Sequence, residues 1–351
     1  MADKEDVIRA LAAVKDPELG RDLVSLHMVD EVEVAGDRVT FTLNLTTPAC
    51  PLRSRLEEAA RAAVEGIPGV KEVEMKTGSM VYATRDYAEA EVLKGVKNII
   101  AVASGKGGVG KSTVAVNLAC ALAASGAKVG ILDADVYGPN IPLMMGVKSR
   151  PEVRDEMVIP PVAHGVKVAS LGFFYDEETP VIWRGPLVAG AVRQLLTQVD
   201  WGELDYLICD LPPGTGDASL TLAQTVPLGG VLIVTTPQDA ALSIAAKALA
   251  MFKRLDAPIL GVVENMSYFV CPHCGERTEI FSGGGGRKIA AERGADFLGE
   301  IPLAVAVREQ TDRGDPVVNS RPDSPEALVY KELAFKVAGM LSIVAYAKMK
   351  K

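Results

Sequence analysis

The stretch that decides the fold is residues 99–113, which read IIAVASGKGGVGKST. It joins a short apolar run to a glycine-rich turn and then to an Ala- and Leu-rich segment. The turn satisfies G-x-x-x-x-G-K-[ST] in the strand, loop and helix context in which this pattern binds nucleotide phosphates. Glycines let successive backbone N–H groups and the positive end of the following helix converge on phosphate oxygens. The stretch therefore predicts an ATP-binding phosphate loop.

Each position of this loop has an expected task. Lys111 is predicted to reach the β and γ phosphates, and the Ser112 hydroxyl is predicted to ligate Mg²⁺. The residues expected to bind the nucleotide are Gly105, Lys106, Gly107, Gly108, Val109, Gly110, Lys111, Ser112 and Thr113. Lys106 is an additional lysine that phosphate binding within one subunit does not require, so it is either a solvated side chain or one with a further task.

The downstream sequence predicts an α/β domain. Short apolar runs alternate with helical stretches, and the expected strands are residues 99–103, 129–133, 206–210, 231–235 and 259–264. Continuously apolar strands between helices predict a mainly parallel sheet covered by helices on both faces. Asp133, Asp135 and Asp210 follow two of these strands, at the edge where such sheets bind ligands. There they can order magnesium or the attacking water, or simply cap the next helix.

The first part of the chain reads as a separate acidic module. Residues 1–90 carry 11 basic and 17 acidic side chains, a net of -6 out of the chain's -8. Helices are expected at residues 4–14 and 51–65, and strands at residues 31–34, 38–45 and 70–75. We predict a small α+β domain over residues 1–83, a linker over 84–97 and the ATPase domain over 98–351.

Charge and hydropathy exclude several classes of protein. A formal net charge of -8 argues against nucleic-acid binding, which needs clustered lysine and arginine. No apolar run approaches the roughly 18 residues of a membrane helix, and the start MADKED is too charged for a signal peptide. The apolar stripe over residues 329–344 is expected to pack on its own domain. We expect a cytoplasmic protein without stable membrane association.

Two of the five cysteines have the spacing of metal ligands, in Cys271-Pro272-His273-Cys274. Thiolates at this spacing can face one metal, yet a tetrahedral zinc or a four-iron cluster takes four sulfurs. The sequence contains no second Cys-x-x-Cys, and a two-fold dimer would supply the missing pair. A redox dithiol, a zinc knuckle and unliganded thiols remain alternatives. Cys120 and Cys209 are predicted core residues, and Cys50, just before a helix, is a candidate for a transient role.

Residues 95–338 resemble the Mrp-type iron–sulfur cluster carrier ATPases, in the superfamily of nitrogenase iron protein, MinD and ParA. The matching motifs are residues 104–113, 133–140, 210–217, 264–267 and 271–274. The resemblance implies that Lys106 crosses a dimer interface to the partner's nucleotide and acts in catalysis with Lys111. It also implies that Asp135 positions the attacking water, that Asp210 is linked to magnesium and that Asn265 recognises adenine.

The same resemblance implies a function. A slow ATP hydrolase of this kind assembles an iron–sulfur cluster, expected to be 4Fe-4S, between the subunits of a homodimer at Cys271 and Cys274. Its expected partners are apo iron–sulfur proteins and a cluster-assembly scaffold. The acidic module resembles a domain that recurs in iron–sulfur assembly proteins. The alternative is a positioning switch like MinD or ParA, with a structural zinc at the cysteine pair.

Overall fold

A computed structural model describes residues 2–17, 20–49, 52–84, 93, 95–135, 138–174, 185–214, 216, 219–220, 223–224 and 226–349. The chain divides into two compact units. The small unit comprises Met1–Tyr82 with Ala338–Lys351, and the large unit is Ala83–Val337. Most of the predicted linker and Cys50 lie outside the described residues, so the extent of the linker and the role of Cys50 stay predictions.

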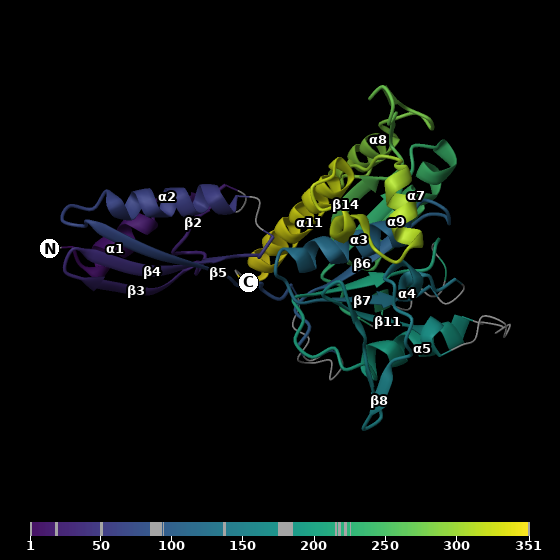
Figure 1. The fold of residues 1–351 in the computed structure, drawn as a ribbon, viewed down its shortest axis with the longest axis horizontal. Helices are drawn as coiled ribbons and strands as arrows, with labels where there is room; N and C mark the ends of the chain where they lie inside the picture. The colour runs from purple at the N-terminus through teal and green to yellow at the C-terminus, as the bar shows by residue number, and fades with distance from the viewer. Residues whose placement is uncertain are drawn as a thin grey trace. The chain divides into compact units, whose positions relative to one another are not determined.

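The small unit packs two helices on a three-stranded sheet (Figure 1). The strand order is β3 (Val29–Ala35), β4 (Arg38–Leu45) and β5 (Glu72–Ser79), with β3 antiparallel and β5 parallel to β4. Alternate residues of β4 are buried, so one face of the sheet is apolar and meets α1 (Lys4–Leu11) and α2 (Arg53–Glu65). The shared core includes Val7, Leu11, Phe41, Leu43, Leu56 and Val64. Two short strands, β1 (Lys15–Asp16) and β2 (Arg21–Asp22), pair beside it.

The large unit is built on one eight-stranded sheet. Its order is β10 (Val162–Ala163), β11 (Val166–Ser170), β7 (Val129–Asp133), β12 (Tyr206–Asp210), β6 (Ile99–Ser104), β13 (Gly230–Thr235), β14 (Ile259–Glu264) and β17 (Phe297–Glu300). All neighbours are parallel except β10 and β11. The four strands from β7 to β13 are buried along their whole length, which explains their continuously apolar sequences. The predicted mainly parallel sheet is confirmed.

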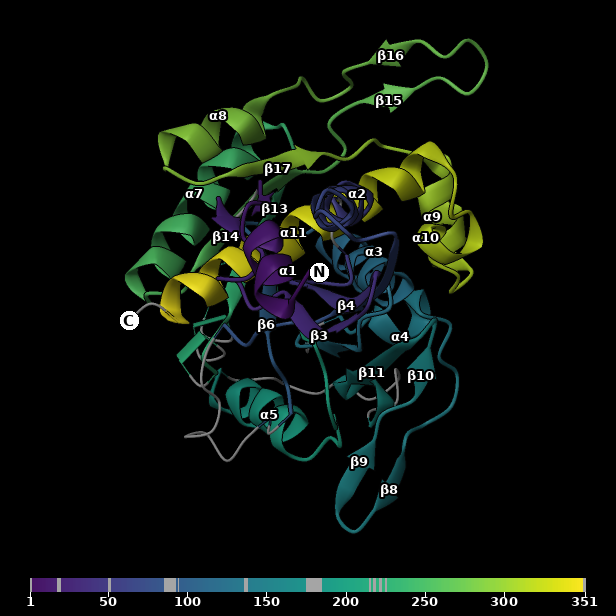
Figure 2. The ribbon, with the colours of Figure 1, turned by 90° about the vertical axis from the view of Figure 1, so that its left-hand side faces the viewer.

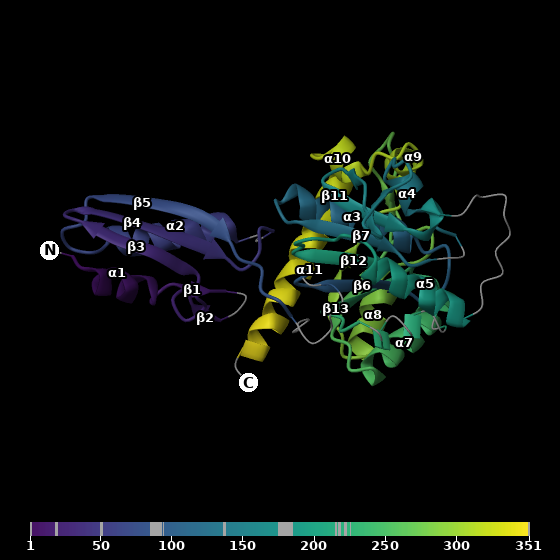
Figure 3. The same cartoon turned by 90° about the horizontal axis from the view of Figure 1, so that it is seen from below.

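Helices cover both faces of this sheet, as predicted (Figure 3). α5 (Gly185–Thr197), α7 (Asp239–Arg254) and α8 (Gly285–Glu292) contribute to one core cluster with the inner strands, and α3 (Lys111–Ala124) packs on the opposite face. Further helices are α4 (Ile141–Met144), α9 (Val305–Asp312), α10 (Val317–Ser320) and α11 (Pro325–Met349), with the 3-10 turn η1 (Leu171–Phe173). No helix among the described residues combines the length and the apolarity needed to cross a membrane.

Two hairpins extend from the large unit (Figure 2). One is formed by β8 (Glu152–Arg154) and β9 (Met157–Ile159), and the other by β15 (Phe269–Val270) and β16 (Arg277–Thr278). The second hairpin carries Cys271 and Cys274. We call residues 268–283 the cysteine hairpin. It leaves the sheet after β14 and returns at α8, so it starts from the same sheet edge as the phosphate loop.

The register of the parallel strands gathers the predicted acidic residues. Asp210 at the end of β12 is level with Asp133 at the end of β7 and with Val102 of β6. The phosphate loop, residues 105–113, leaves β6 just beyond this level. Because the carboxyl ends of parallel strands share one edge, side chains far apart in the sequence meet beside the loop.

Gly130 of β7 packs closely against the side chains of Trp201 and Leu204, and this contact allows a test of the fold. A methyl group added at Gly130 would lie 2.8 Å from both the Trp201 ring and the Leu204 side chain, so Gly130→Ala should lower the free energy of unfolding by about 1 to 3 kcal/mol. Gly190 lies on the exposed side of α5 with nothing within 4 Å of such a methyl group, so Gly190→Ala should be neutral or slightly stabilising. Urea denaturation of both variants measures the difference. Equal effects would contradict the packing described for β7.

Candidate functional site

The phosphate loop adopts a conformation that needs its glycines. Gly108 has φ 80° and Gly110 has φ 78°, in the left-handed region that residues with a side chain rarely adopt. Gly105 packs so closely on α7 that a Cβ there would lie 2.6 Å from the backbone nitrogen of Ala245. Gly110 is also the N-cap of α3, which has no side-chain cap. No side chain caps the first backbone N–H groups of α3, so these groups are suited to donate hydrogen bonds to phosphate oxygens.

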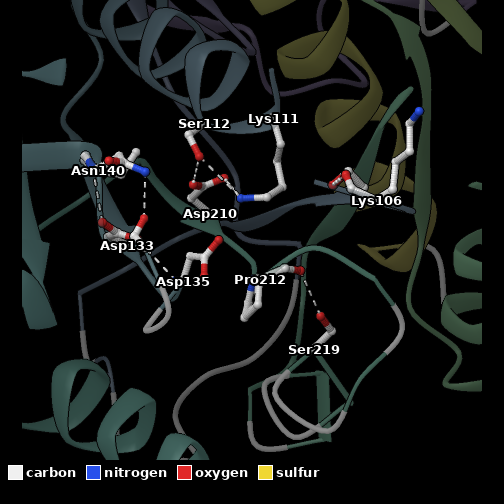
Figure 4. Close-up of polar contacts among 12 residues, drawn as sticks. Lys106, Lys111, Ser112, Asp133, Asp135, Asn140, Asp210, Pro212 and Ser219 are labelled. Carbon is white, nitrogen blue, oxygen red and sulfur yellow. Dashed lines mark hydrogen bonds and ion pairs between the residues drawn. The ribbon is translucent and has the colours of Figure 1, made fainter. Parts of the chain in front are cut away.

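A buried ion pair lies at the centre of the site (Figure 4). The Lys111 Nζ donates to Asp210 Oδ1 at 2.7 Å, and the Ser112 hydroxyl donates to Asp210 Oδ2 at 2.6 Å. The side chains of Lys111 and Asp210 are 6% and 1% exposed. A hydroxyl and a carboxylate at this separation supply the hard oxygen ligands that Mg²⁺ prefers, and the ammonium beside them suits a phosphate. The geometry thus fits a magnesium nucleotide.

Asp133 organises the segment that carries Asp135. Its buried carboxylate accepts from the backbone N–H of Asp135 at 3.1 Å, from that of Ile141 at 3.2 Å and from the Ser170 hydroxyl at 3.1 Å. Burial, followed by the charge of Asp210, raises the pKa of Asp133 to about 7. Figure 4 shows Asp135 on the same side of Lys111 as Asp133 and Asp210. Asp133 therefore binds the backbone of this segment, including the first residue of α4, and Asp135 is partly buried.

Lys106 does not join the ion pair. Its Nζ donates to Gln238 Oε1 at 3.3 Å, and the same oxygen accepts from the Thr236 hydroxyl at 2.9 Å. Figure 4 shows the Lys106 side chain directed away from Lys111 and Asp210. Sequence reasoning missed Gln238, although its place just after the predicted strand 231–235 marked it as a residue of the ligand-binding edge.

Asn265 lies against the phosphate loop rather than in open solvent. It is 5% exposed, its Nδ2 donates to the Val109 carbonyl at 2.8 Å, and its backbone N–H donates to the Thr235 carbonyl at 2.8 Å. A Cβ at Gly110 would lie 2.2 Å from the Asn265 Nδ2, so the contact also depends on that glycine. Recognition of adenine by Asn265 stays a prediction.

The cysteine pair lies in a tight turn with one thiol partly buried and the other exposed. The Cys271 N–H donates to the Glu276 carbonyl at 2.9 Å, and the Gly275 N–H donates to the Cys271 carbonyl at 2.8 Å. The N–H groups of Cys274 and His273, with the Cys274 thiol, lower the pKa of Cys271, so the thiolate that binds metals is favoured. In the described ranges no group of three or more His, Cys, Asp or Glu side chains is placed to hold a metal ion.

Cys120 and Cys209 are core residues, as predicted. Both are fully buried, and burial raises the pKa of the Cys120 thiol to about 12 and that of Cys209 further still. Neither thiol is available as a ligand in this fold. The described part of the chain therefore presents Cys271 and Cys274 as its accessible thiols.

Comparison with known proteins matches both parts of the chain. Residues 95–338 match the family described as NUBPL iron-transfer P-loop NTPase, and residues 4–75 match the family described as iron-sulfur cluster assembly protein. The iron-sulfur cluster carrier protein of Synechocystis sp. is 48% identical, covering 98% of this chain and 99% of the relative. The chain belongs to the iron–sulfur cluster carrier family of P-loop NTPases. The Escherichia coli K12 carrier protein is 42% identical, covering 95% of this chain and 91% of the relative.

Solved structures place this carrier-family chain among nucleotide-binding proteins. A nucleotide-binding protein from Archaeoglobus fulgidus, in complex with ADP, is 41% identical with a TM-score of 0.60, covering 70% of this chain and 96% of that one. The cell division ATPase MinD of Pyrococcus furiosus is 23% identical with a TM-score of 0.53, covering 68% of this chain and 98% of that one. The second likeness concerns the fold alone. The relatives confirm the predicted family, and both solved structures confirm its P-loop fold.

The buried Lys111–Asp210 ion pair predicts that this carrier-family chain needs Lys111 to bind nucleotide. Lys111→Ala should weaken ATP binding by about tenfold to 100-fold, because a charge-assisted contact to phosphate is lost. Lys97→Ala is the matched control, since Lys97 forms an ion pair of similar length, 2.8 Å, with Asp205 outside the site. A fluorescent ATP analogue titrated in the presence of Mg²⁺ measures both affinities. An unchanged affinity in Lys111→Ala would rule out this role for Lys111.

Proposed function

We propose that this protein is an ATP-hydrolysing carrier that holds an iron–sulfur cluster between two copies of the chain and transfers it to apo iron–sulfur proteins. The observation that carries the proposal is the pair of thiols, the partly buried Cys271 and the exposed Cys274, on a hairpin of the same unit that contains the phosphate loop. The membership of the chain in the carrier family supports the nature of the cargo.

The number of thiols supports a shared cluster. A 4Fe-4S cluster takes four thiolates, and the hairpin offers two. A two-fold axis through the tip of the hairpin would bring two pairs together, as closed homodimers commonly do. Exposure of Cys274 would leave the cluster within reach of the thiols of an apo-protein or an assembly scaffold, so that it is carried rather than buried.

The polar residues of the phosphate loop suggest how nucleotide acts. Bound Mg²⁺ and ATP would supply positive charge and a phosphoryl group at the loop. Ser112 and Asp210 would hold the metal, while Lys111 would turn from Asp210 towards the phosphates. Asp135 would orient the attacking water, and Asn265 would contact adenine. Because the Lys111–Asp210 pair must rearrange before nucleotide is held productively, we expect slow hydrolysis.

Lys106 would act between subunits. Its side chain is hydrogen-bonded to Gln238 and directed away from Asp210 of the same chain, so it takes no part in the Lys111–Asp210 ion pair. Release from Gln238 would let it reach the partner's nucleotide. Hydrolysis would then be coupled to dimer geometry, and with it to the shared cluster. We place this work in the cytoplasm, without nucleic acid or a membrane.

The cargo is tested by anaerobic purification followed by iron, sulfide and zinc analysis. About two irons and two sulfides per chain are expected, because a four-iron cluster is divided between two chains. Cys271→Ala should lose both, whereas Cys120→Ala, which changes a buried thiol, should retain them. Stoichiometric zinc without sulfide would replace the carrier proposal with a positioning switch that uses zinc as a structural metal.

The task of Lys106 is tested by oligomeric state. With a slowly hydrolysed ATP analogue and Mg²⁺, the wild-type chain should elute as a dimer, and Lys106→Ala should remain largely monomeric while still binding the analogue. Gln238→Ala is the matched variant, since it frees Lys106 and should favour the dimer. Size-exclusion chromatography with light scattering measures this. Dimers of equal stability in all three proteins would contradict a role across the interface.

A further inference from the structure

One buried carboxylate joins the two ends of the cysteine hairpin. Glu264, the last residue of β14, is fully buried. Its Oε1 accepts from the Ser267 hydroxyl at 2.6 Å and from the Gly284 N–H at 3.2 Å, and its Oε2 accepts from the Gly286 N–H. Ser267 directly precedes the hairpin, and Gly284 directly follows it. The residues that flank the cysteine hairpin, Ser267 and Gly284, are therefore both hydrogen-bonded to the Glu264 side chain.

The donors that hold the Glu264 carboxylate are uncharged. Among the described residues its printed partners are the Ser267 hydroxyl and the backbone N–H groups of Gly284 and Gly286. A buried carboxylate without a cation is costly, and here it is compensated by two backbone N–H groups at the start of α8 and one hydroxyl. The fit is close, since a Cβ at Gly286 would lie 2.9 Å from the Glu264 Cβ.

The neighbour of Glu264 contacts the phosphate loop. Asn265 donates to the Val109 carbonyl at 2.8 Å and packs against Gly110. Two consecutive residues thus bind the phosphate loop on one side and both ends of the cysteine hairpin on the other. A displacement of Val109 when nucleotide enters the loop would be passed through Asn265 to Glu264, and from there to Ser267 and Gly284.

We propose that Glu264 is a positioning residue that couples the nucleotide loop to the cysteine pair by clamping both ends of the hairpin. The inference deepens the proposed function, because it assigns the connection through which nucleotide would act on the cluster site. It concerns the conformation of the hairpin and not the cluster itself. It can therefore be tested on the cluster-free chain, where failure of the coupling is distinct from failure of cluster binding.

The test is the alkylation rate of Cys271 and Cys274 by iodoacetamide, followed by mass spectrometry of the peptide that contains them. The full-length, cluster-free protein is labelled without nucleotide and with Mg²⁺-ADP raised until the rate no longer changes, at a concentration at which light scattering shows monomer. In the wild type, ADP should slow labelling about fivefold or more, the lower range of typical coupling between sites. In Glu264→Gln the two rates should be equal, because an amide cannot accept from donors on both oxygens.

Two further variants make the result specific. Glu276→Gln changes the same charge within the hairpin on an exposed residue, and it should keep the wild-type ratio of rates. Ser267→Ala removes one donor to Glu264 and should bring the ratio closer to one, and it decides the matter if Glu264→Gln does not fold. The proposal is overturned if ADP leaves the wild-type rate unchanged, or if the folded Glu264→Gln or Ser267→Ala variant keeps the full wild-type ratio.

Discussion

The buried ion pair between Lys111 and Asp210 is the constraint around which the large unit is arranged. Two opposite charges in an interior are tolerated only when their geometry is good and their remaining hydrogen-bonding groups are satisfied. The parallel register of β6, β7 and β12 provides that geometry, because it brings the end of β12 next to the loop that follows β6. Ser112 supplies the second partner of Asp210. Lys111 and Ser112 thus each bind one oxygen of the Asp210 carboxylate.

The polar residues around the pair form separate contacts with separate tasks. Asp133 binds backbone N–H groups of the next segment, and burial followed by the charge of Asp210 raises its pKa to about 7, so it carries only part of a negative charge near neutral pH. Gln238 holds Lys106 away from the loop of its own subunit. These contacts distinguish two lysines that the sequence places five positions apart. Lys111 is paired with Asp210 in the buried centre, and Lys106 is hydrogen-bonded to Gln238 outside it.

The cysteine hairpin depends on the same edge of the sheet. Its thiols are accessible, and the turn that holds them favours the thiolate of Cys271. Its stem is tied to β14 through Glu264, and Arg277 lies over the Tyr268 ring with its guanidinium carbon 3.7 Å from the ring centroid. The hairpin thus combines a stem held by side-chain contacts with a tip that carries the exposed Cys274. The small unit has its own core and its own sheet.

The sequence by itself determined the phosphate loop, the parallel sheet, the family and the cysteine pair. Those features are local, because a glycine pattern, an apolar run or a two-residue spacing carries its physical reason within a few neighbouring residues. Strand ends were predicted within a few residues, yet the edge strands β10 and β17 and the strand β11 beside β10 were missed, since their burial depends on neighbours. Only the tertiary structure decided which partners Lys106, Asp133 and Glu264 have. Gln238, Ser170 and Gly286 lie 132, 37 and 22 positions away from them, and no periodicity encodes such distances.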